Sequence, residues 1–166
     1  MKKIGLFYGS DTDNTENVVE KLKTFFGDDL DLIDISNSNI EQIKSYDHII
    51  FATPTWGDGD LQSDWENFED NLDEIDFSTK KIALVGLGDQ DSYSDTFCDA
   101  VGILYEKVKN GKVIGKTSPE GYDFEESKAL IDDEFVGLII DEMNQDELTD
   151  QRIENWVQQI KQEFEN

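Results

Sequence analysis

Short apolar runs alternate with helix-like stripes along this chain, and this alternation limits its fold more than any other feature. The apolar runs cover residues 3–8, 30–35, 48–53, 81–86 and 113–114. Apolar residues recur every three or four positions at 18–26, 40–46, 65–75, 100–108 and 153–164. Strands that alternate with helices form a parallel sheet with helices on both faces. The sequence therefore predicts a doubly wound α/β fold with a five-stranded parallel sheet.

One segment, residues 117–137, breaks this alternation. It contains a Ser-Pro pair, two glycines and an acidic run, and strand-like character resumes only over Phe135–Ile140. A length of 166 residues suits one domain. We therefore expect a single domain over 1–166, with an insertion at about 117–137 that splits the fifth strand.

The charge of the chain restricts its partners. It carries 39 acids against 14 bases, a formal net charge of −25, while ten Phe, five Tyr and three Trp supply material for a core. This balance disfavours nucleic acid and anionic membranes, and it favours salt-sensitive encounters with basic protein surfaces. We expect a monomer with such partners.

The cysteine content and the hydropathy pattern bear on the compartment. Cys98 is the one cysteine, so no intramolecular disulfide can form, which fits a reducing compartment. The apolar stretch near the N-terminus is too short for the core of a signal peptide, and no stretch approaches membrane-spanning length. We expect a cytoplasmic protein.

Polar residues follow three of the predicted strands. The stretches are GSDTDNTEN at 9–17, TPTWGDGD at 53–60 and GDQDSY at 88–93. In open α/β sheets, ligands bind beyond the carboxyl ends of the strands, so the three stretches should meet at one edge. The first offers hydroxyls and free N–H groups at a helix start, which suits a phosphate, although a Ser- and Thr-rich helix cap would look the same.

Two aromatic residues lie within the other two stretches. Trp56 stands beside Gly57 and Gly59, and Tyr93 follows the fourth strand. An aromatic on each of two loops around an anion site indicates a planar heterocycle that carries a phosphate, although each aromatic alone could serve local packing.

Three longer stretches carry a specific family resemblance. GSDTDNTENV, TPTWGDGDLQSDWENF and GLGDQDSYSDTFCDAVG resemble the phosphate loop and the two flavin loops of the long-chain flavodoxins, and the tail from Gly137 to Phe164 is similar to theirs. The resemblance implies FMN as cofactor and strand order 2-1-3-4-5, for which flavodoxin is itself the reference example. It also relates the segment 117–137 to the loop that distinguishes long-chain members.

The function that this resemblance implies is low-potential, one-electron transfer. FMN bound without a covalent link would shuttle between neutral semiquinone and anionic hydroquinone, and would pass electrons from a reductase to acceptor enzymes. The protein would be an electron-transfer flavoprotein and not an enzyme, without a catalytic residue or a metal.

The resemblance also assigns roles to residues. The phosphate falls to the hydroxyls of Ser10, Thr12 and Thr15 and to the N–H groups of Asp11, Asp13 and Asn14. Thr53 and Thr55 approach the ribityl chain and the phosphate, Trp56 and Tyr93 sandwich the ring, and Asp89 lies near its pyrimidine edge. The peptide Gly57–Asp58 would flip so that its carbonyl oxygen accepts a hydrogen bond from the N5–H group of the reduced ring. Glycine permits this flip because it reaches positive φ without a side-chain clash. Pro54, Gly59, Gly88 and Cys98 complete the predicted cofactor-binding set, although Cys98 suits packing better than redox chemistry.

Two residues depart from the family pattern. Asp13 stands where the phosphate loop usually carries glycine, which predicts a weaker phosphate contribution. Met143 stands in a segment where relatives commonly carry an acid, so a ribityl contact from that position is in doubt.

Acidic runs flank the predicted flavin loops. Residues 58–76 hold nine acids and no Lys or Arg, and residues 89–99 add four acids. Such runs usually form a solvated face, but around a flavin they would also disfavour an anionic reduced form and attract basic partners.

Two other functions share this fold class. A phosphorylated receiver domain needs an aspartate at the end of the third strand, where this chain has Ala52-Thr53-Pro54. An FMN-dependent two-electron NAD(P)H or quinone reductase needs an open face on the ring, which Trp56 and Tyr93 should cover.

Overall fold

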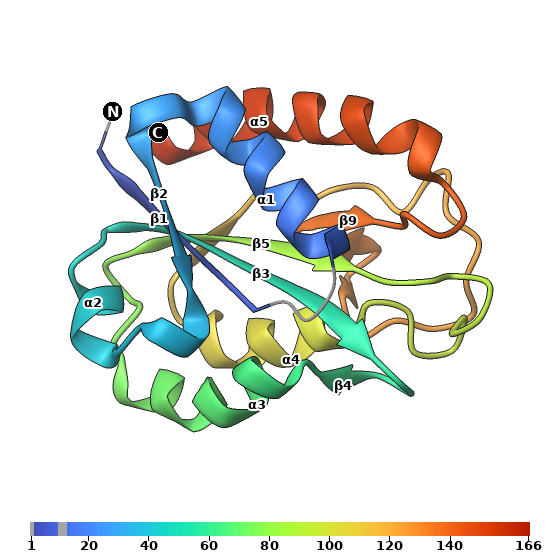
Figure 1. Ribbon diagram of the computed structural model, residues 1–166, viewed down its shortest axis with the longest axis horizontal. Coiled ribbons are helices and arrows are strands. Elements are labelled where there is room, and N and C mark those ends of the chain that lie inside the picture. The colour runs from blue at the N-terminus through green and yellow to red at the C-terminus, as the bar shows by residue number, and fades with distance from the viewer. Residues whose placement is uncertain (1, 10–12) are drawn as a thin grey trace.

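The computed structural model describes residues 2–9 and 13–166, and its central element is a twisted sheet (Figure 1). The sheet contains β1 (Ile4–Tyr8), β2 (Leu30–Asp34), β3 (His48–Trp56), β5 (Lys81–Leu87), β6 (Lys112–Ile114) and β9 (Leu138–Ile140). Its strand order is β2-β1-β3-β5-β6, all parallel, and β9 also pairs with β5. The predicted doubly wound α/β fold is therefore confirmed.

Helices cover both faces of this sheet. α1 (Asp13–Phe26) and α5 (Thr149–Glu165) lie together on one face, and α2 (Ile40–Lys44), α3 (Ser63–Phe68) and α4 (Asp99–Val108) lie on the other (Figure 1). Each face has its own buried apolar cluster, as expected for strands that are buried on both sides. The predicted stripe of α5 is confirmed, since its members are all buried: Ile153, Trp156, Val157, Ile160 and Phe164. Among the described residues, no helix combines the length and apolar character needed to cross a membrane.

The end of the third strand differs from the prediction. The third strand was expected to end at residue 53, but β3 continues to Trp56 and forms a hairpin with the short antiparallel strand β4 (Asp60–Leu61). Trp56 pairs with Asp60, and the turn between them has Gly57 and Gly59 at φ +50° and +99°. Both glycines supply a backbone conformation that other residues rarely adopt.

The predicted helix over 65–75 is also only partly correct. The α-helical part ends at Phe68, and a 3-10 helix, η3 (Glu69–Glu74), follows it. Acidic residues are unfavourable at the negative end of a helix, and neither element has a basic residue in its last turn. Three further 3-10 helices connect elements: η1 (Gly27–Asp29), η2 (Ile35–Asn37) and η4 (Asp146–Leu148).

The fifth strand position is filled by two segments. β6 pairs with Lys81–Ala83 of β5, and β9 pairs with Val85–Leu87 of the same strand. The segment between them carries a small hairpin of β7 (Leu130–Ile131) and β8 (Glu134–Phe135), so Phe135 belongs to this hairpin and the sheet resumes at Leu138. The relation of this segment to the long-chain loop stays a prediction.

Candidate functional site

A cleft of about 260 Å³ lies at the carboxyl ends of the strands. Residues from all three predicted stretches line it: Asn14, Thr15, Pro54, Thr55, Trp56, Gly88, Asp89 and Tyr93. The other lining residues, Leu87, Glu142 and Met143, are not in the predicted cofactor-binding set. The expected meeting of the three stretches at one edge is therefore confirmed.

One end of the cleft is formed by the start of α1. Thr15 is fully buried, and its Oγ1 has no hydrogen-bond partner among the residues the structure describes. Asn14 is half-buried beside it, whereas Asp13 is exposed and does not line the cleft. Ser10, Asp11 and Thr12, also predicted at this end, lie outside the described residues. A free hydroxyl beside the N–H groups of a helix start is suited to bind an anion.

The aromatic residues lie at the other end. Trp56 comes from the β3–β4 hairpin and Tyr93 from the loop after β5, and each is 40% exposed although both are large and apolar. The Thr55 hydroxyl accepts a hydrogen bond from the Ala100 N–H at 3.1 Å and so ties the hairpin to the start of α4. Exposed aromatic surface on a fixed hairpin is suited to pack a planar ligand.

Besides Asp13 and Cys98, four predicted site residues of β3 and its hairpin turn do not line the cleft. Thr53 is fully buried, and its hydroxyl donates to the Pro54 carbonyl oxygen at 2.8 Å, so its predicted ribityl contact is not supported. Gly59 is buried against Asp99, whereas Gly57 and Asp58 are exposed on the hairpin turn and line neighbouring depressions.

Cys98 lies beneath the loop that follows β5 and not in the cleft. It is fully buried just before α4 with φ +54°, and burial raises the pKa of its thiol well above the usual value. A Cβ added at Gly88 would lie 2.7 Å from its sulfur, so the two residues pack directly together. A buried thiol of raised pKa suits packing and not redox chemistry, in agreement with the prediction.

Asp89 faces inward and caps its own loop. Its Oδ1 accepts hydrogen bonds from the N–H groups of Asp91 and Ser92 and from the Asn144 side chain at 2.8–3.1 Å. Partial burial acts to raise the pKa of Asp89, but the hydrogen bonds from Ser92 and Asn144 outweigh it and hold the pKa below its usual value. The carboxylate therefore stays ionised at the cleft wall.

Asp141, which joins two walls of the cleft, was not predicted from the sequence. Its carboxylate is fully buried after β9 and accepts hydrogen bonds from the backbone and side chain of Gln90 at 3.0 and 2.7 Å. It also accepts from the N–H groups of Met143 and Asn144 at 3.1 and 3.0 Å. The one signal in the sequence was an acid directly after the apolar run 138–140.

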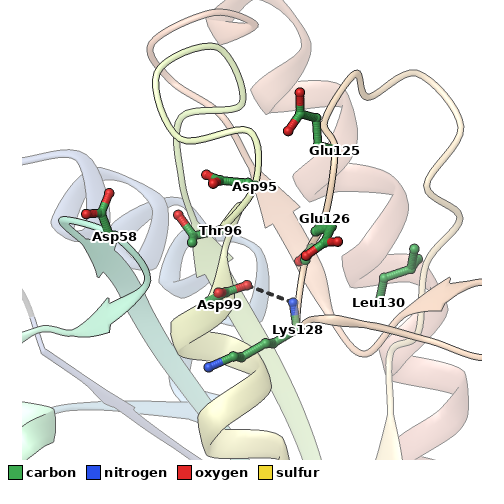
Figure 2. Close-up of a pocket in the computed structure, with 9 residues that line it drawn as sticks. Asp58, Asp95, Thr96, Asp99, Glu125, Glu126, Lys128 and Leu130 are labelled. Atoms are coloured by element: carbon green, nitrogen blue, oxygen red, sulfur yellow. Dashed lines mark hydrogen bonds between the residues drawn. The ribbon is translucent and has the colours of Figure 1, made fainter.

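An acidic depression of about 580 Å³ lies beside the hairpin (Figure 2). Its carboxylates come from Asp58, Asp95, Asp99, Glu125 and Glu126. Asp99 is only 4% exposed and accepts a hydrogen bond from the Lys128 N–H at 2.7 Å, and burial raises its pKa. Over the described part of the chain, no group of His, Cys, Asp and Glu is arranged to hold a metal ion.

The fold and cleft define a class of protein. In this sheet the connection after β1 leads to β2 on one side, whereas the connection after β3 leads to β5 on the other side, and ligands of doubly wound α/β proteins bind at such a switch point. The start of α1 and the aromatic hairpin meet there, so the chain is a doubly wound α/β protein with a candidate ligand cleft at its switch point.

Comparison with known proteins then gives the family. The family model described as Flavodoxin matches residues 6–156, and the chain belongs to the flavodoxin family. It is 50% identical over 164 residues to a flavodoxin of Helicobacter pylori, with 99% of each chain covered. It is 49% identical over 166 residues to one of Nostoc sp., with 98% of each covered.

A solved structure has the same architecture. The crystal structure of Fusobacterium nucleatum flavodoxin bound to flavin mononucleotide matches this chain with a TM-score of 0.94 and 39% identity, and 99% of each chain is covered.

Proposed function

We propose that this chain binds FMN without a covalent link and carries electrons one at a time from a reductase to acceptor enzymes. The flavin would alternate between its neutral semiquinone and anionic hydroquinone states. The observation that carries this proposal is the cleft, in which a buried Thr15 hydroxyl at a helix start, without a partner among the described residues, faces the same space as two exposed aromatics. Family membership and the FMN-bound relative from Fusobacterium nucleatum support it.

The cleft residues fit the parts of FMN. Thr15 and Asn14 would hold the phosphate with neutral donors and the helix dipole, which contributes about 0.3–1 kcal/mol near an exposed terminus. Trp56 and Tyr93 would pack on the ring and exclude water from it, which adds about 0.5–1.5 kcal/mol per aromatic pair beyond area burial. FMN, when bound, supplies the one-electron chemistry.

The acids around the cleft would set a low potential for the anionic reduced state. At an effective dielectric constant of about 20, a carboxylate about 12 Å from the flavin costs an anionic flavin about 1.4 kcal/mol. For a one-electron couple this corresponds to about 59 mV. Asp89, held ionised at the cleft wall, and Asp58, Asp95 and Glu126 beside the hairpin would act together in this sense.

The same charges would select the partners. Basic surfaces on a reductase and on acceptor proteins would meet the acidic rim near the exposed aromatics, with encounter rates that fall as salt rises. We propose that the chain acts there as a monomer in a reducing, cytoplasmic environment.

Anaerobic titration of the FMN-loaded protein with a one-electron reductant tests the function. We expect a flavin spectrum that passes through a long-wavelength neutral semiquinone before it bleaches. Direct bleaching in one two-electron step, together with turnover of NAD(P)H by the isolated protein, would instead support a two-electron reductase. Purified protein that neither contains nor takes up FMN would overturn the proposal.

A further inference from the structure

We propose that Glu142 is a binding residue of the cleft that accepts a hydrogen bond from a hydroxyl of the ligand's polyol chain. The inference rests on the proposed function, because it concerns the ribityl chain of FMN. Glu142 lines the cleft, and its Oε1 is buried without a hydrogen-bond partner among the residues the structure describes. A buried carboxylate oxygen without a donor is costly, so a donor from the ligand would satisfy it.

The backbone on both sides of Glu142 is fixed. Asp141, fully buried, accepts from both Gln90 and the N–H groups of Met143 and Asn144, so hydrogen bonds hold the residues that precede and follow Glu142. Asn144 also donates from its side chain to Asp89 on the facing loop at 2.8 Å. Glu142 is therefore presented from an ordered turn, which reduces the entropy lost when a ligand binds.

The chemistry of the cleft selects a hydroxyl as the donor. No Lys, Arg or His is among the described residues that line it, so Glu142 has no basic partner there. A carboxylate repels a phosphate, and the phosphate-binding groups Thr15 and Asn14 come from the start of α1. Met143, the next residue, is 68% exposed and carries a thioether, which is only a weak acceptor and so competes little with Glu142 for a hydroxyl donor.

Two uncharged flavins separate a contact with the hydroxylated chain from an effect of Glu142 on the phosphate or on the ring. Riboflavin carries the ring and the hydroxylated chain, whereas lumiflavin carries the ring with a methyl group in place of the chain. Neither has a phosphate, so the loss of a carboxylate charge does not change a phosphate repulsion. We would titrate the FMN-free full-length protein with both flavins and follow the quenching of flavin fluorescence.

We expect Glu142→Leu to weaken riboflavin binding by about tenfold or more, since a hydrogen bond to a charged group is lost, and to leave lumiflavin binding unchanged. Glu142→Gln retains an acceptor oxygen and should lose less riboflavin affinity than Glu142→Leu. The matched control is Glu147→Leu, because Glu147 is an exposed acid of η4 outside the cleft lining and its removal should change neither affinity.

Equal losses for riboflavin and lumiflavin in Glu142→Leu would overturn the inference and indicate a merely structural residue. Unchanged or tighter riboflavin binding would overturn it as well. Near-ultraviolet circular dichroism verifies that each variant is folded. Failure of the wild-type protein to bind FMN would refute the proposed function itself, so the two failures are distinguishable.

Discussion

At the scale of single residues, the phosphate end of the cleft combines a favourable and an unfavourable group. Thr15 offers a buried hydroxyl that has no partner in the part of the chain that the structure describes, while Asp13 places a carboxylate in the first turn of the same helix. An acid in that turn stabilises the helix but opposes a bound dianion. Asp13 is exposed, so its side chain leaves room for a ligand and acts mainly through its charge.

We therefore predict that Asp13→Gly and Asp13→Asn, the latter of which retains the size of the side chain, bind FMN about two- to fivefold more tightly. This corresponds to about 0.3–1 kcal/mol, the magnitude of the effect of one charge near a helix terminus. Riboflavin binding should stay the same because riboflavin has no phosphate. Fluorescence titration measures both constants. Glu20→Gln, at an exposed position of the same helix, is the control and should change neither. An equal gain for both flavins would contradict a phosphate effect.

The one histidine makes stability depend on pH. His48 is 8% exposed, its ring stacks on Phe164 with a centroid distance of 4.7 Å, and its Nδ1 has no partner among the described residues. Burial, with the charges of Lys81 and Lys2, holds the pKa of His48 below its usual 6.5. As the pH falls below about 6.5, His48 becomes protonated in the unfolded chain while it stays neutral in the folded protein. The free energy of unfolding therefore decreases through this range.

We expect His48→Phe, which can keep the aromatic contact, to lose this part of the pH dependence. Urea unfolding of both proteins at pH 7.5, 6.5 and 5.5 measures it. As the pH falls, the unfolding free energy of the wild type should decrease more than that of the variant. A difference that is constant across the three pH values would show that His48 titrates alike in both states.

At the scale of elements, the β3–β4 hairpin carries the residues nearest to the proposed ring. Its two glycines differ: a Cβ added at Gly57 would meet one atom, 3.6 Å away, whereas at Gly59 it would lie 2.8 Å from Asp99 Oδ2. Substitution at Gly59 would therefore displace the hairpin, but substitution at Gly57 changes mainly its backbone preference.

We predict that Gly57→Ala lowers the yield of neutral semiquinone in the anaerobic titration, because alanine reaches fewer backbone conformations than glycine and so restricts the proposed peptide flip. Alanine at the observed φ of +50° also costs about 1–2 kcal/mol of stability. Gly27→Ala is a matched control, since Gly27 has φ +59° with nothing within 4 Å. It should lose similar stability without a change in semiquinone yield. Equal yields in all three proteins would remove Gly57 from the mechanism.

The hairpin also shows where sequence patterns stop being informative. Periodicity predicted the sheet, both helical layers and the three polar strand ends, because each depends on neighbours along the chain. The extension of β3 was missed because Pro54 and two glycines are typical of turns, whereas the pairing of Trp56 with Asp60 depends on a two-residue partner strand. Thr53 was placed in the cleft, but its position opposite Gly86 inside the sheet buries it.

The wall made by Asp141 and Glu142 was beyond sequence reasoning for a similar reason. The role of Asp141 comes from Gln90, which lies far from it along the chain and meets it only when β5 and β9 pair. The Asp141 carboxylate without those donors would be an ordinary strand-end acid.

At the scale of the whole molecule, a net charge of −25 acts against folding as well as for solubility. Salt shortens the reach of this repulsion, from about 30 Å at 0.01 M to about 8 Å at 0.15 M. The ion pairs among the described residues are mostly exposed, and each contributes little. Added salt should therefore weaken the repulsion among the acidic side chains more than it weakens the attraction within the ion pairs.

We expect the melting temperature of the FMN-free protein to rise by a few degrees between 10 and 300 mM NaCl, about 2–4 °C for each 1 kcal/mol gained. Thermal unfolding followed by circular dichroism measures this rise. Its steepest part should come at low salt and then level off, as screening requires. A rise that continues linearly to high salt would indicate ion exclusion instead, and a fall would contradict net self-repulsion.

The divided edge of the sheet has a consequence for how this chain can change in length. β6 ends opposite Ala83 and β9 begins opposite Val85. The two segments therefore occupy the same position beside β5, and only Leu84 lies between their pairing partners. The entropy of closing the detour between them grows slowly, by about 0.6 kcal/mol for each doubling of its length. Extra residues at exposed positions of the detour, away from the buried Ala129 and Phe135, therefore add little entropic cost to the closure of the sheet.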